Sequence, residues 1–197
     1  MDLTLMPART ALVVIDLQRG TTARPTAPHP ASDVVAHTAA LAAALRPAGG
    51  TVVLVHGIRS ADGKDALHPL TDTPPWQPGP RAANWSEIVP ELGPEPSDLV
   101  IGKRQWGAFY GTDLDLQLRR RGIDTILLTG IATNIGVEST ARDAFERGYA
   151  QVFVEDAMAS LGPDEHANTI RTVFPRIGRV RSTAEVLTAL EAASKPA

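Results

Sequence analysis

The sequence predicts an α/β fold, a three-layer α/β/α sandwich around a mostly parallel six-stranded sheet. Short apolar runs rich in β-branched residues alternate with helical patterns along the chain, which is typical of parallel crossover units. The run at residues 10–17 is apolar without alternation, as expected of a central strand covered on both faces. With 197 residues, 43% of them hydrophobic, the chain can form one such domain over residues 1–197.

Six segments carry the strand pattern. Each is a short aliphatic run bounded by glycine, proline or polar residues. The stretch between the first strand and the first helix, residues 18–30, is rich in Thr, Ala and Pro, and we expect a loop there. The predicted strands span residues 10–17, 51–56, 98–102, the opening of 124–144, 150–155 and 177–180.

Capping residues mark the helix starts. Ser32 or Asp33 precedes the first helix, and Thr112 with Asp113 opens the second. Glycines end both of these helices, and a proline lies in the first turn of the fourth. The predicted helices run from 32 or 33 to about 49, from 112 to 121, through the end of 124–144, and over 163–174 and 182–193.

A long segment, about residues 57–97, carries many prolines and no regular pattern, and such length is typical of a lid or an interface. Its Trp76 and Trp85 lie near Arg59 and Arg81 in sequence, so the four residues could wall and clamp an anionic ring. The alternative is that the tryptophans pin the loop to the body of the protein or to a second subunit.

Composition narrows the function classes. The formal net charge of −3 gives no basic surplus for nucleic acid, and no apolar run approaches a membrane span. The amino terminus lacks the pattern of a signal peptide, so we expect a cytoplasmic protein. There is no cysteine, which excludes disulfides, thiolate metal ligands and a cysteine nucleophile.

Three strand ends indicate a site. Asp16 and Lys103 each end a strand that is otherwise apolar, and Gly136 lies in the turn after the strand within 124–144. The carboxyl ends of parallel strands share one edge, so we expect the carboxylate and the ammonium to meet beside Gly136, with unpaired N–H groups of residues 134–137 pointing there. A purely structural ion pair that holds loops is the alternative.

These residues carry a resemblance. The chain resembles the isochorismatase-like hydrolase superfamily, often called the cysteine hydrolases, over nearly its whole length. The match rests on Val-Val-Ile-Asp-Leu-Gln at 13–18, on Lys103 with the following Trp-Gly-Ala-Phe and Thr-Asp-Leu, and on the run from Gly130 to Ala144. The resemblance implies helices on both faces of the sheet, an Asp–Lys–Cys triad, a non-proline cis peptide near residues 131–132, and homo-oligomers, either dimers or tetramers.

The chain departs from the commonest family pattern at the nucleophile, because Gly136 occupies the cysteine position. Ser139 lies about one helical turn onward without a nucleophile elbow, so it is a poor substitute. Nicotinamidase-like members hold a metal through an Asp-x-His and a later His. Because His56 and His68 lack that arrangement, we expect no metal and no other cofactor.

Glycine at this position resembles isochorismatases proper, which cleave a vinyl ether to pyruvate and a dihydrodiol without a covalent intermediate. By this resemblance Asp16 is the general acid, Lys103 orients it and binds a substrate carboxylate, and the Gly136 N–H lies against the ligand. Burial raises the pKa of Asp16 and the ammonium lowers it, and the sequence does not decide between them.

Further residues are candidates for lining the site, although each alone is also explained as a core or loop-fixing residue. We interpret Thr133 mainly as a turn and capping residue and Asn134 as orienting the turn. The substrate-binding candidates are Gln18, Arg59, Arg81, Trp85, Gln105, Trp106, Phe109, Ala132, Thr133 and Asn134.

Three functional hypotheses remain open at this stage. The first is vinyl-ether hydrolysis of isochorismate or a related enolpyruvyl acid. The second is hydrolysis of another small amide or carbonyl compound, with Asp16 activating water directly. The third is a non-catalytic protein on the same scaffold; loss of the cysteine favours it, and the retained Asp16 and Lys103 argue against it.

Overall fold

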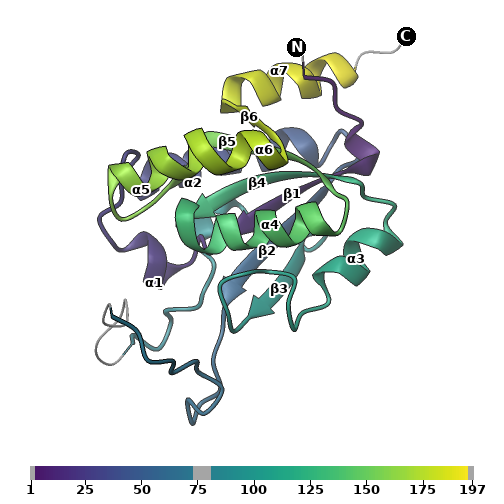
Figure 1. Cartoon of the computed structure of the whole chain (residues 1–197). Coiled ribbons are helices and arrows are strands. Elements are labelled where there is room, and N and C mark those ends of the chain that lie inside the picture. The colour runs from purple at the N-terminus through teal and green to yellow at the C-terminus, as the bar shows by residue number, and fades with distance from the viewer. Residues whose placement is uncertain (1–2, 73–80, 195–197) are drawn as a thin grey trace.

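The sheet confirms the predicted fold class. In the computed structural model, which describes residues 3–72 and 81–194, six strands form one sheet in the order β3-β2-β1-β4-β5-β6, and every neighbouring pair is parallel (Figure 1). The strands are β1 (Thr10–Ile15), β2 (Thr51–Gly57), β3 (Leu99–Lys103), β4 (Thr125–Ile131), β5 (Ala150–Ala159) and β6 (Arg179–Arg181).

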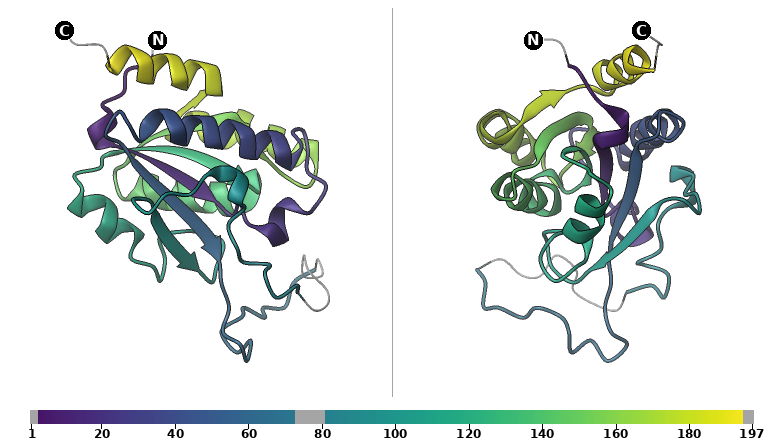
Figure 2. Two further views of the ribbon diagram at one scale, coloured as in Figure 1. Left: turned by 180° about the vertical axis from the view of Figure 1, so that it is seen from behind. Right: turned by 90° about the vertical axis from the view of Figure 1, so that its right-hand side faces the viewer.

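Helices cover both faces of this sheet, as the two views in Figure 2 show. On one face, α2 (Ala31–Leu45) and α7 (Thr183–Ala193) form one core cluster with aliphatic side chains of β1, β2, β4 and β5, and α7 packs on α2 and β5. On the other face, α3 (Leu114–Arg120), α4 (Glu138–Glu146) and α6 (Phe174–Ile177) form a second core cluster. β1 is buried at all six positions because both clusters cover it.

Several helix predictions need correction. A short helix, α1 (Arg19–Thr22), lies in the segment predicted to be a loop. The N-cap of α2 is Pro30, not Ser32 or Asp33, and the helix ends at Leu45, earlier than predicted. The α3 helix ends one residue earlier than predicted, at Arg120.

The helix predicted over 163–174 runs further than expected. It consists of α5 (Pro163–Asn168), the π-helix η4 (Thr169–Val173) and α6, which ends at Ile177. The remaining short helices are the 3₁₀ turns η1 (Pro7–Arg9) and η2 (Pro90–Leu92) and the π-helix η3 (Thr133–Val137).

The first three strands differ from the prediction by one or two residues at their ends, with β1 ending at Ile15, and the last two strands differ more. β5 continues to Ala159, because its pairing with β4 shifts register: Leu128 pairs with Phe153, and Gly130 already pairs with Met158. The charged residues 155–156 lie in this bulge. They interrupt the run of hydrophobic residues, so the sequence pattern did not predict that the strand continues. β6 begins at Arg179, after α6 has taken up the start of the predicted strand.

Candidate active site

Asp16 begins the site, directly after β1. Its N–H donates to the Val55 carbonyl at 2.9 Å, which continues the sheet by one bond. Its φ of 54° lies in the left-handed region, so the chain turns away from the strand at this residue. The carboxyl group remains at the carboxyl edge of the sheet, with 18% of the side chain exposed.

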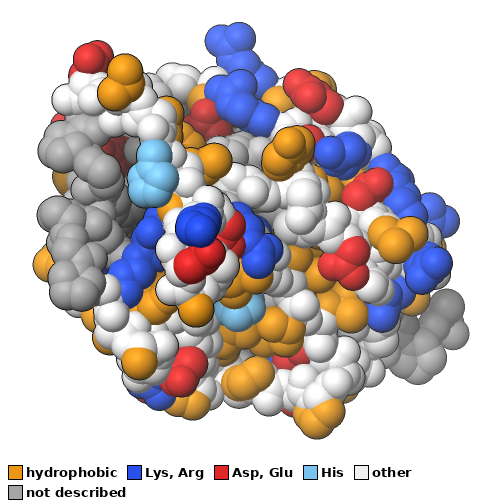
Figure 3. All heavy atoms as spheres, turned by 90° about the horizontal axis from the view of Figure 1, so that it is seen from below, with side chains coloured by type: hydrophobic (Ala, Val, Ile, Leu, Met, Phe, Trp, Pro, Cys, Tyr) orange, Lys and Arg blue, Asp and Glu red, His pale blue; other side chains and the backbone are white. Residues whose placement is uncertain are grey.

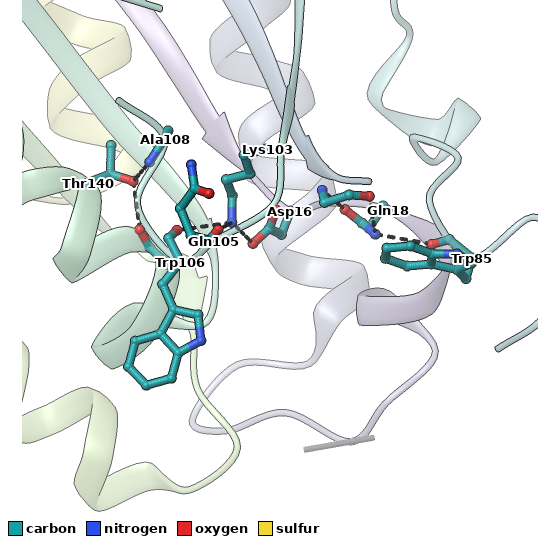
Figure 4. A network of polar contacts seen from close by, with 10 residues as sticks. Asp16, Gln18, Trp85, Lys103, Gln105, Trp106, Ala108 and Thr140 are labelled. Carbon is teal, nitrogen blue, oxygen red and sulfur yellow. Dashed lines mark hydrogen bonds and ion pairs between the residues drawn. The ribbon is translucent and has the colours of Figure 1, made fainter. Parts of the chain in front are cut away.

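Lys103 reaches Asp16 from β3, across the end of β2. Two strand spacings separate β3 from β1, about 10 Å, so only a long side chain can close the gap. Its Nζ donates to Asp16 Oδ2 at 2.7 Å and to the carbonyl oxygens of Gln105 and Trp106 at 3.1 and 3.0 Å (Figure 4). An ammonium has three donors, so all three are used inside the protein.

Gly136 completes the predicted convergence of three strand ends. A Cβ placed on Gly136 would lie 3.0 Å from Ile15 Cγ2, 3.2 Å from Asp16 Oδ2 and 3.5 Å from the Trp106 carbonyl oxygen. The turn therefore lies directly against the Asp16 carboxyl group and against one of the carbonyls that accept from Lys103. A side chain at this position would meet the Asp16 carboxyl group.

The hydrogen bonds of this turn differ in part from the prediction of unpaired N–H groups. The Ile135 and Val137 N–H groups donate to the Ala132 carbonyl at 3.1 and 3.2 Å, and the Asn134 N–H reaches Ser160 Oγ at 3.5 Å. Three of the four N–H groups thus have partners within the chain, because the π-helix η3 and its neighbour Ser160 supply acceptors for them.

The Asp16 carboxyl group is only half satisfied. Oδ2 accepts from Lys103, whereas the buried Oδ1 has no hydrogen-bond partner in the described part of the chain. Burial raises the pKa of Asp16 above its usual value, and this effect exceeds the lowering by Lys103 and the smaller lowering by His56. The structure thereby answers the question that the sequence left open. Asp16 is an acid that holds its proton more tightly than an ordinary aspartic acid.

Gln18 fixes the wall next to the site. Its Oε1 accepts from the Gly57 N–H at 2.6 Å and its Nε2 donates to the Trp85 carbonyl at 3.2 Å (Figure 4). The Gly20 N–H donates to the same Trp85 carbonyl at 2.8 Å. Gln18 thus connects the end of β2 to the long segment and sets the position of Trp85. These hydrogen bonds indicate a structural role for Gln18.

One arginine packs on Trp85. The Arg81 guanidinium lies 4.1 Å from the centre of the Trp85 ring. The pKa of Arg81 is lowered first by burial and then by the nearby charges of Arg59 and Arg24. The structure therefore places Arg81 on Trp85, and the charges of Arg59 and Arg24 lie close enough to Arg81 to lower its pKa. Trp76 lies outside the described residues.

The candidates after Lys103 lie in different surroundings. The Gln105 amide donates to the Tyr110 carbonyl, and the Trp106 indole is exposed and points away from the ion pair (Figure 4). Phe109 is buried in the core, with its ring 5.8 Å from that of Tyr149. These positions favour structural roles for Gln105 and Phe109.

The candidates Ala132, Thr133 and Asn134 lie directly after β4, at the start of the turn that contains Gly136. The peptide between Ile131 and Ala132 is cis, in agreement with the family resemblance. Thr133 is fully buried, and its hydroxyl contacts His166 Nδ1 at 2.9 Å. Asn134 Oδ1 accepts from Ser160 Oγ at 2.9 Å.

Sequence reasoning did not single out His166 or Ser160, because both become partners of the turn only when their segments pack against it. Burial, and secondarily the neighbouring His29, lower the pKa of His166 to about 4.

Around the site, neither positive nor negative side chains predominate on the face of the molecule shown in Figure 3. In Figure 3 basic and acidic side chains are interspersed with hydrophobic ones. Within residues 3–72 and 81–194 there is no group of three or more His, Cys, Asp or Glu residues placed to hold a metal ion. No helix in the same ranges is long and apolar enough to cross a membrane.

Comparison with known proteins identifies the family. The isochorismatase domain model matches residues 10–185, which include Asp16, Lys103 and Gly136. The chain belongs to the isochorismatase family. Its fold is that of an isochorismatase-like hydrolase, and the chain is a hydrolase of this family.

Relatives of this isochorismatase-family chain include both uncharacterised proteins and an amidohydrolase. The uncharacterised isochorismatase family protein YwoC of Bacillus subtilis (strain 168) is 51% identical over 180 residues, 91% of this chain and 93% of YwoC. The ureidoacrylate amidohydrolase RutB of Methylobacterium radiotolerans is 41% identical over 109 residues, 55% of this chain and 42% of RutB.

A solved structure shares nearly the whole fold. An isochorismatase family protein from Burkholderia thailandensis superimposes with a TM-score of 0.92 at 49% identity, covering 97% of this chain and 100% of that one.

Proposed function

We propose that this hydrolase cleaves the vinyl ether of isochorismate, or of a related enolpyruvyl acid, to pyruvate and a diol, with Asp16 as general acid. One observation carries the proposal. The Asp16 carboxyl group binds Lys103 through Oδ2, holds a buried and unpartnered Oδ1, and lies against a residue without a side chain.

The reaction needs an acid and no nucleophilic side chain. A proton from Asp16 adds to the terminal CH₂ carbon of the enolpyruvyl group, which leaves an oxocarbenium ion. Water adds to the carbon that carries the ether oxygen and loses a proton. The hemiketal then breaks its bond to the ring oxygen, which gives pyruvate and the ring hydroxyl. No bond to the enzyme forms, which fits a chain without cysteine.

The raised pKa of Asp16 supports its role as the acid. A carboxyl group donates a proton only while it is protonated, and burial extends that range toward neutral pH. Oδ1 is free to carry the proton, because Oδ2 faces the ammonium.

Lys103 is better suited to orienting Asp16 than to binding a substrate carboxylate. Its three donors are used by Asp16 and by the carbonyls of Gln105 and Trp106, and the side chain is buried. Binding a carboxylate directly would require it to give up one of these bonds.

We therefore assign the substrate carboxylates to Arg81, which packs on Trp85, and to the arginines near it. The indole offers a flat wall for a ring, and Arg81 on its face offers donors suited to a carboxylate. Arg59 and Arg24 add positive charge nearby. A substrate with a flat ring and two carboxylates, such as isochorismate, matches this arrangement.

A second function is hydrolysis of a small amide in which Asp16 activates water. The similarity to a ureidoacrylate amidohydrolase favours it. The two functions differ in pH dependence. An acid catalyst loses activity as the pH rises above the Asp16 pKa, whereas a base catalyst loses activity as the pH falls below it.

The first test measures pyruvate release from isochorismate. Wild-type protein is compared with Asp16→Asn and with Asp33→Asn, the same chemical change at an exposed position at the start of α2. We expect Asp16→Asn to keep substrate binding and to lose about 10²- to 10⁴-fold in kcat, with Asp33→Asn unchanged. A chelator should have no effect. Release equal to the spontaneous rate in wild type, or retained turnover in Asp16→Asn, would exclude the proposal.

A second test follows the proton. In D₂O, protonation at carbon places one deuterium in the methyl group of pyruvate, which mass spectrometry detects. The proposal predicts one deuterium per turnover. Cleavage of the bond between the ring carbon and the ether oxygen would also deuterate the methyl group, through enolpyruvate, but in H₂¹⁸O it would place ¹⁸O in the diol, so a labelled diol would exclude the proposal.

A further inference from the structure

Thr140 joins the two segments that hold the ion pair. It lies on α4, four residues after Gly136, and is fully buried. Its Oγ1 donates to the Gly136 carbonyl at 2.7 Å and accepts from the Ala108 N–H at 3.1 Å (Figure 4). One hydroxyl thus binds the turn after β4 to the loop after β3.

The loop after β3 is the part of the chain that positions the Lys103 ammonium. Two of the three ammonium bonds go to carbonyls of this loop, those of Gln105 and Trp106. The next residue, Gly107, lies against α4, since a Cβ on it would be 3.7 Å from Ser139. The loop is therefore held at α4, with Thr140 as its hydrogen-bonding anchor.

The chemistry of threonine suits this double contact. In a helix its hydroxyl donates back to the carbonyl four residues earlier and keeps a lone pair for a second partner. Its β-branched side chain restricts rotation, so the hydroxyl position is fixed. Valine has nearly the same shape but can make neither bond, and it would leave the Ala108 N–H without its partner.

We propose that Thr140 is a positioning residue, whose hydroxyl sets the distance between the carbonyls that hold Lys103 and the turn that carries Gly136. Through these carbonyls it fixes where the ammonium meets Asp16. The role of this contact in turnover rests on the proposed function, whereas its effect on the ion pair does not.

A matched control exists on the neighbouring helix. Thr169 is also buried, and its Oγ1 donates to Glu138 Oε2 on α4 at 2.7 Å. This bond ties another segment to the same helix without touching the loop after β3. Thr169→Val therefore removes a comparable hydrogen bond with no direct path to Lys103.

The experiment titrates the Asp16 carboxyl group by ¹³C NMR in the full-length protein, with the signal assigned by its absence in Asp16→Asn. We expect Thr140→Val to raise the Asp16 pKa above that of wild type, because a displaced ammonium stabilises the carboxylate less. Thr140→Ser keeps the hydroxyl and should restore the wild-type titration. Thr169→Val should leave it unchanged.

Kinetics supply the second measurement. For Thr140→Val we expect kcat to fall by about 10²-fold with little change in KM, as for a small misplacement of a catalytic group. The pH profile should shift together with the titration.

Each outcome decides the proposal. An Asp16 titration in Thr140→Val equal to that of wild type, or moved equally by Thr169→Val, would overturn it. If Thr140→Val does not fold, Thr140→Ala removes the same hydroxyl with less bulk, and failure of both to fold would assign the hydroxyl to stability alone. A shifted titration without pyruvate release from isochorismate in wild type would reject the proposed function and leave the positioning role standing.

Discussion

β3 carries an ion pair at each of its ends, and the two pairs are built differently. Before its first residue, Asp98 accepts from Arg46 Nε at 3.0 Å, from Arg46 Nη2 at 2.7 Å and from the Glu95 N–H at 2.9 Å. At its last residue, Lys103 meets Asp16 through a single carboxylate oxygen. Both acids are largely shielded, with 2% of the Asp98 side chain and 18% of the Asp16 side chain exposed.

The difference lies in which group is satisfied. At the amino end of β3, both carboxylate oxygens of Asp98 have partners. This pair connects the end of α2, where Arg46 lies, to the residue before β3. At the carboxyl end the base is saturated and the acid keeps an unpartnered oxygen. A fully satisfied pair contributes to the fold, whereas a half-satisfied acid retains chemistry that it can offer to a substrate.

The largest expected effect is on the amino-end pair. Asp98→Ala removes both side-chain bonds between Asp98 and Arg46 and leaves Arg46 only the Gly93 carbonyl and the exposed Glu95 carboxylate, so we expect the free energy of unfolding to fall by about 3 kcal/mol in urea denaturation. Replacing both residues, Arg46→Met with Asp98→Leu, should recover much of this loss. Turnover per folded molecule should stay unchanged, and a selective loss of activity would contradict the assignment of this pair to structure.

The next effect is at Gly136. Gly136→Ala places a methyl group 3.0 Å from Ile15 and 3.2 Å from Asp16, so we expect a loss of about 1–3 kcal/mol in stability and about 10²-fold in kcat/KM. Gly162→Ala is the control, because its Cβ would meet its nearest atom at 3.7 Å. Full activity in Gly136→Ala would show that the substrate does not approach this turn.

A smaller effect follows from the raised pKa of Asp16. The folded protein binds this proton more tightly than the unfolded chain, in which the pKa is near 3.8. Stability therefore falls as the pH rises from just below 3.8 through the folded-state pKa, and Asp16→Asn lacks this loss. Urea unfolding of both proteins over a pH series should show the variant gaining on wild type as the pH rises. A constant difference would mean that the acid is not perturbed.

The last expected effect has the opposite sign and arises at His166, beside the turn after β4. His166 has a folded-state pKa of about 4 against 6.5 in the unfolded chain, so the unfolded chain binds more protons between these values. Stability should fall as the pH decreases from 6.5 to 4, and His166→Gln should flatten that part of the curve. An unchanged slope in the variant would exclude His166 as its source.

The sheet edge that carries the candidate site was predictable, because parallel strands end at one edge. Asp16, Lys103 and Gly136 therefore had to converge once their strands were recognised. The balance of their electrostatics was not predictable, because the number of partners of each polar atom depends on loop geometry. The saturated ammonium and the unpartnered Oδ1 are both of this kind.

The other features that the sequence analysis did not predict have local causes. The end of β5 was missed because its bulge places charged residues inside a strand. Thr140 and His166 were missed because each gains its role from a residue brought to it only by packing of the folded chain. Nothing in the helical patterns around them marks either residue.

The left-handed backbone of Asp16 has a consequence for engineering. A φ of 54° is uncommon for a residue with a side chain; aspartate and asparagine adopt it at a lower cost than most residues, and glycine adopts it without strain. Burial of a carboxyl group at the same residue adds to the cost. Selection for heat resistance alone should therefore favour Asn or Gly at position 16, and these variants should be inactive. A search for more thermostable variants therefore needs an activity screen at the same step.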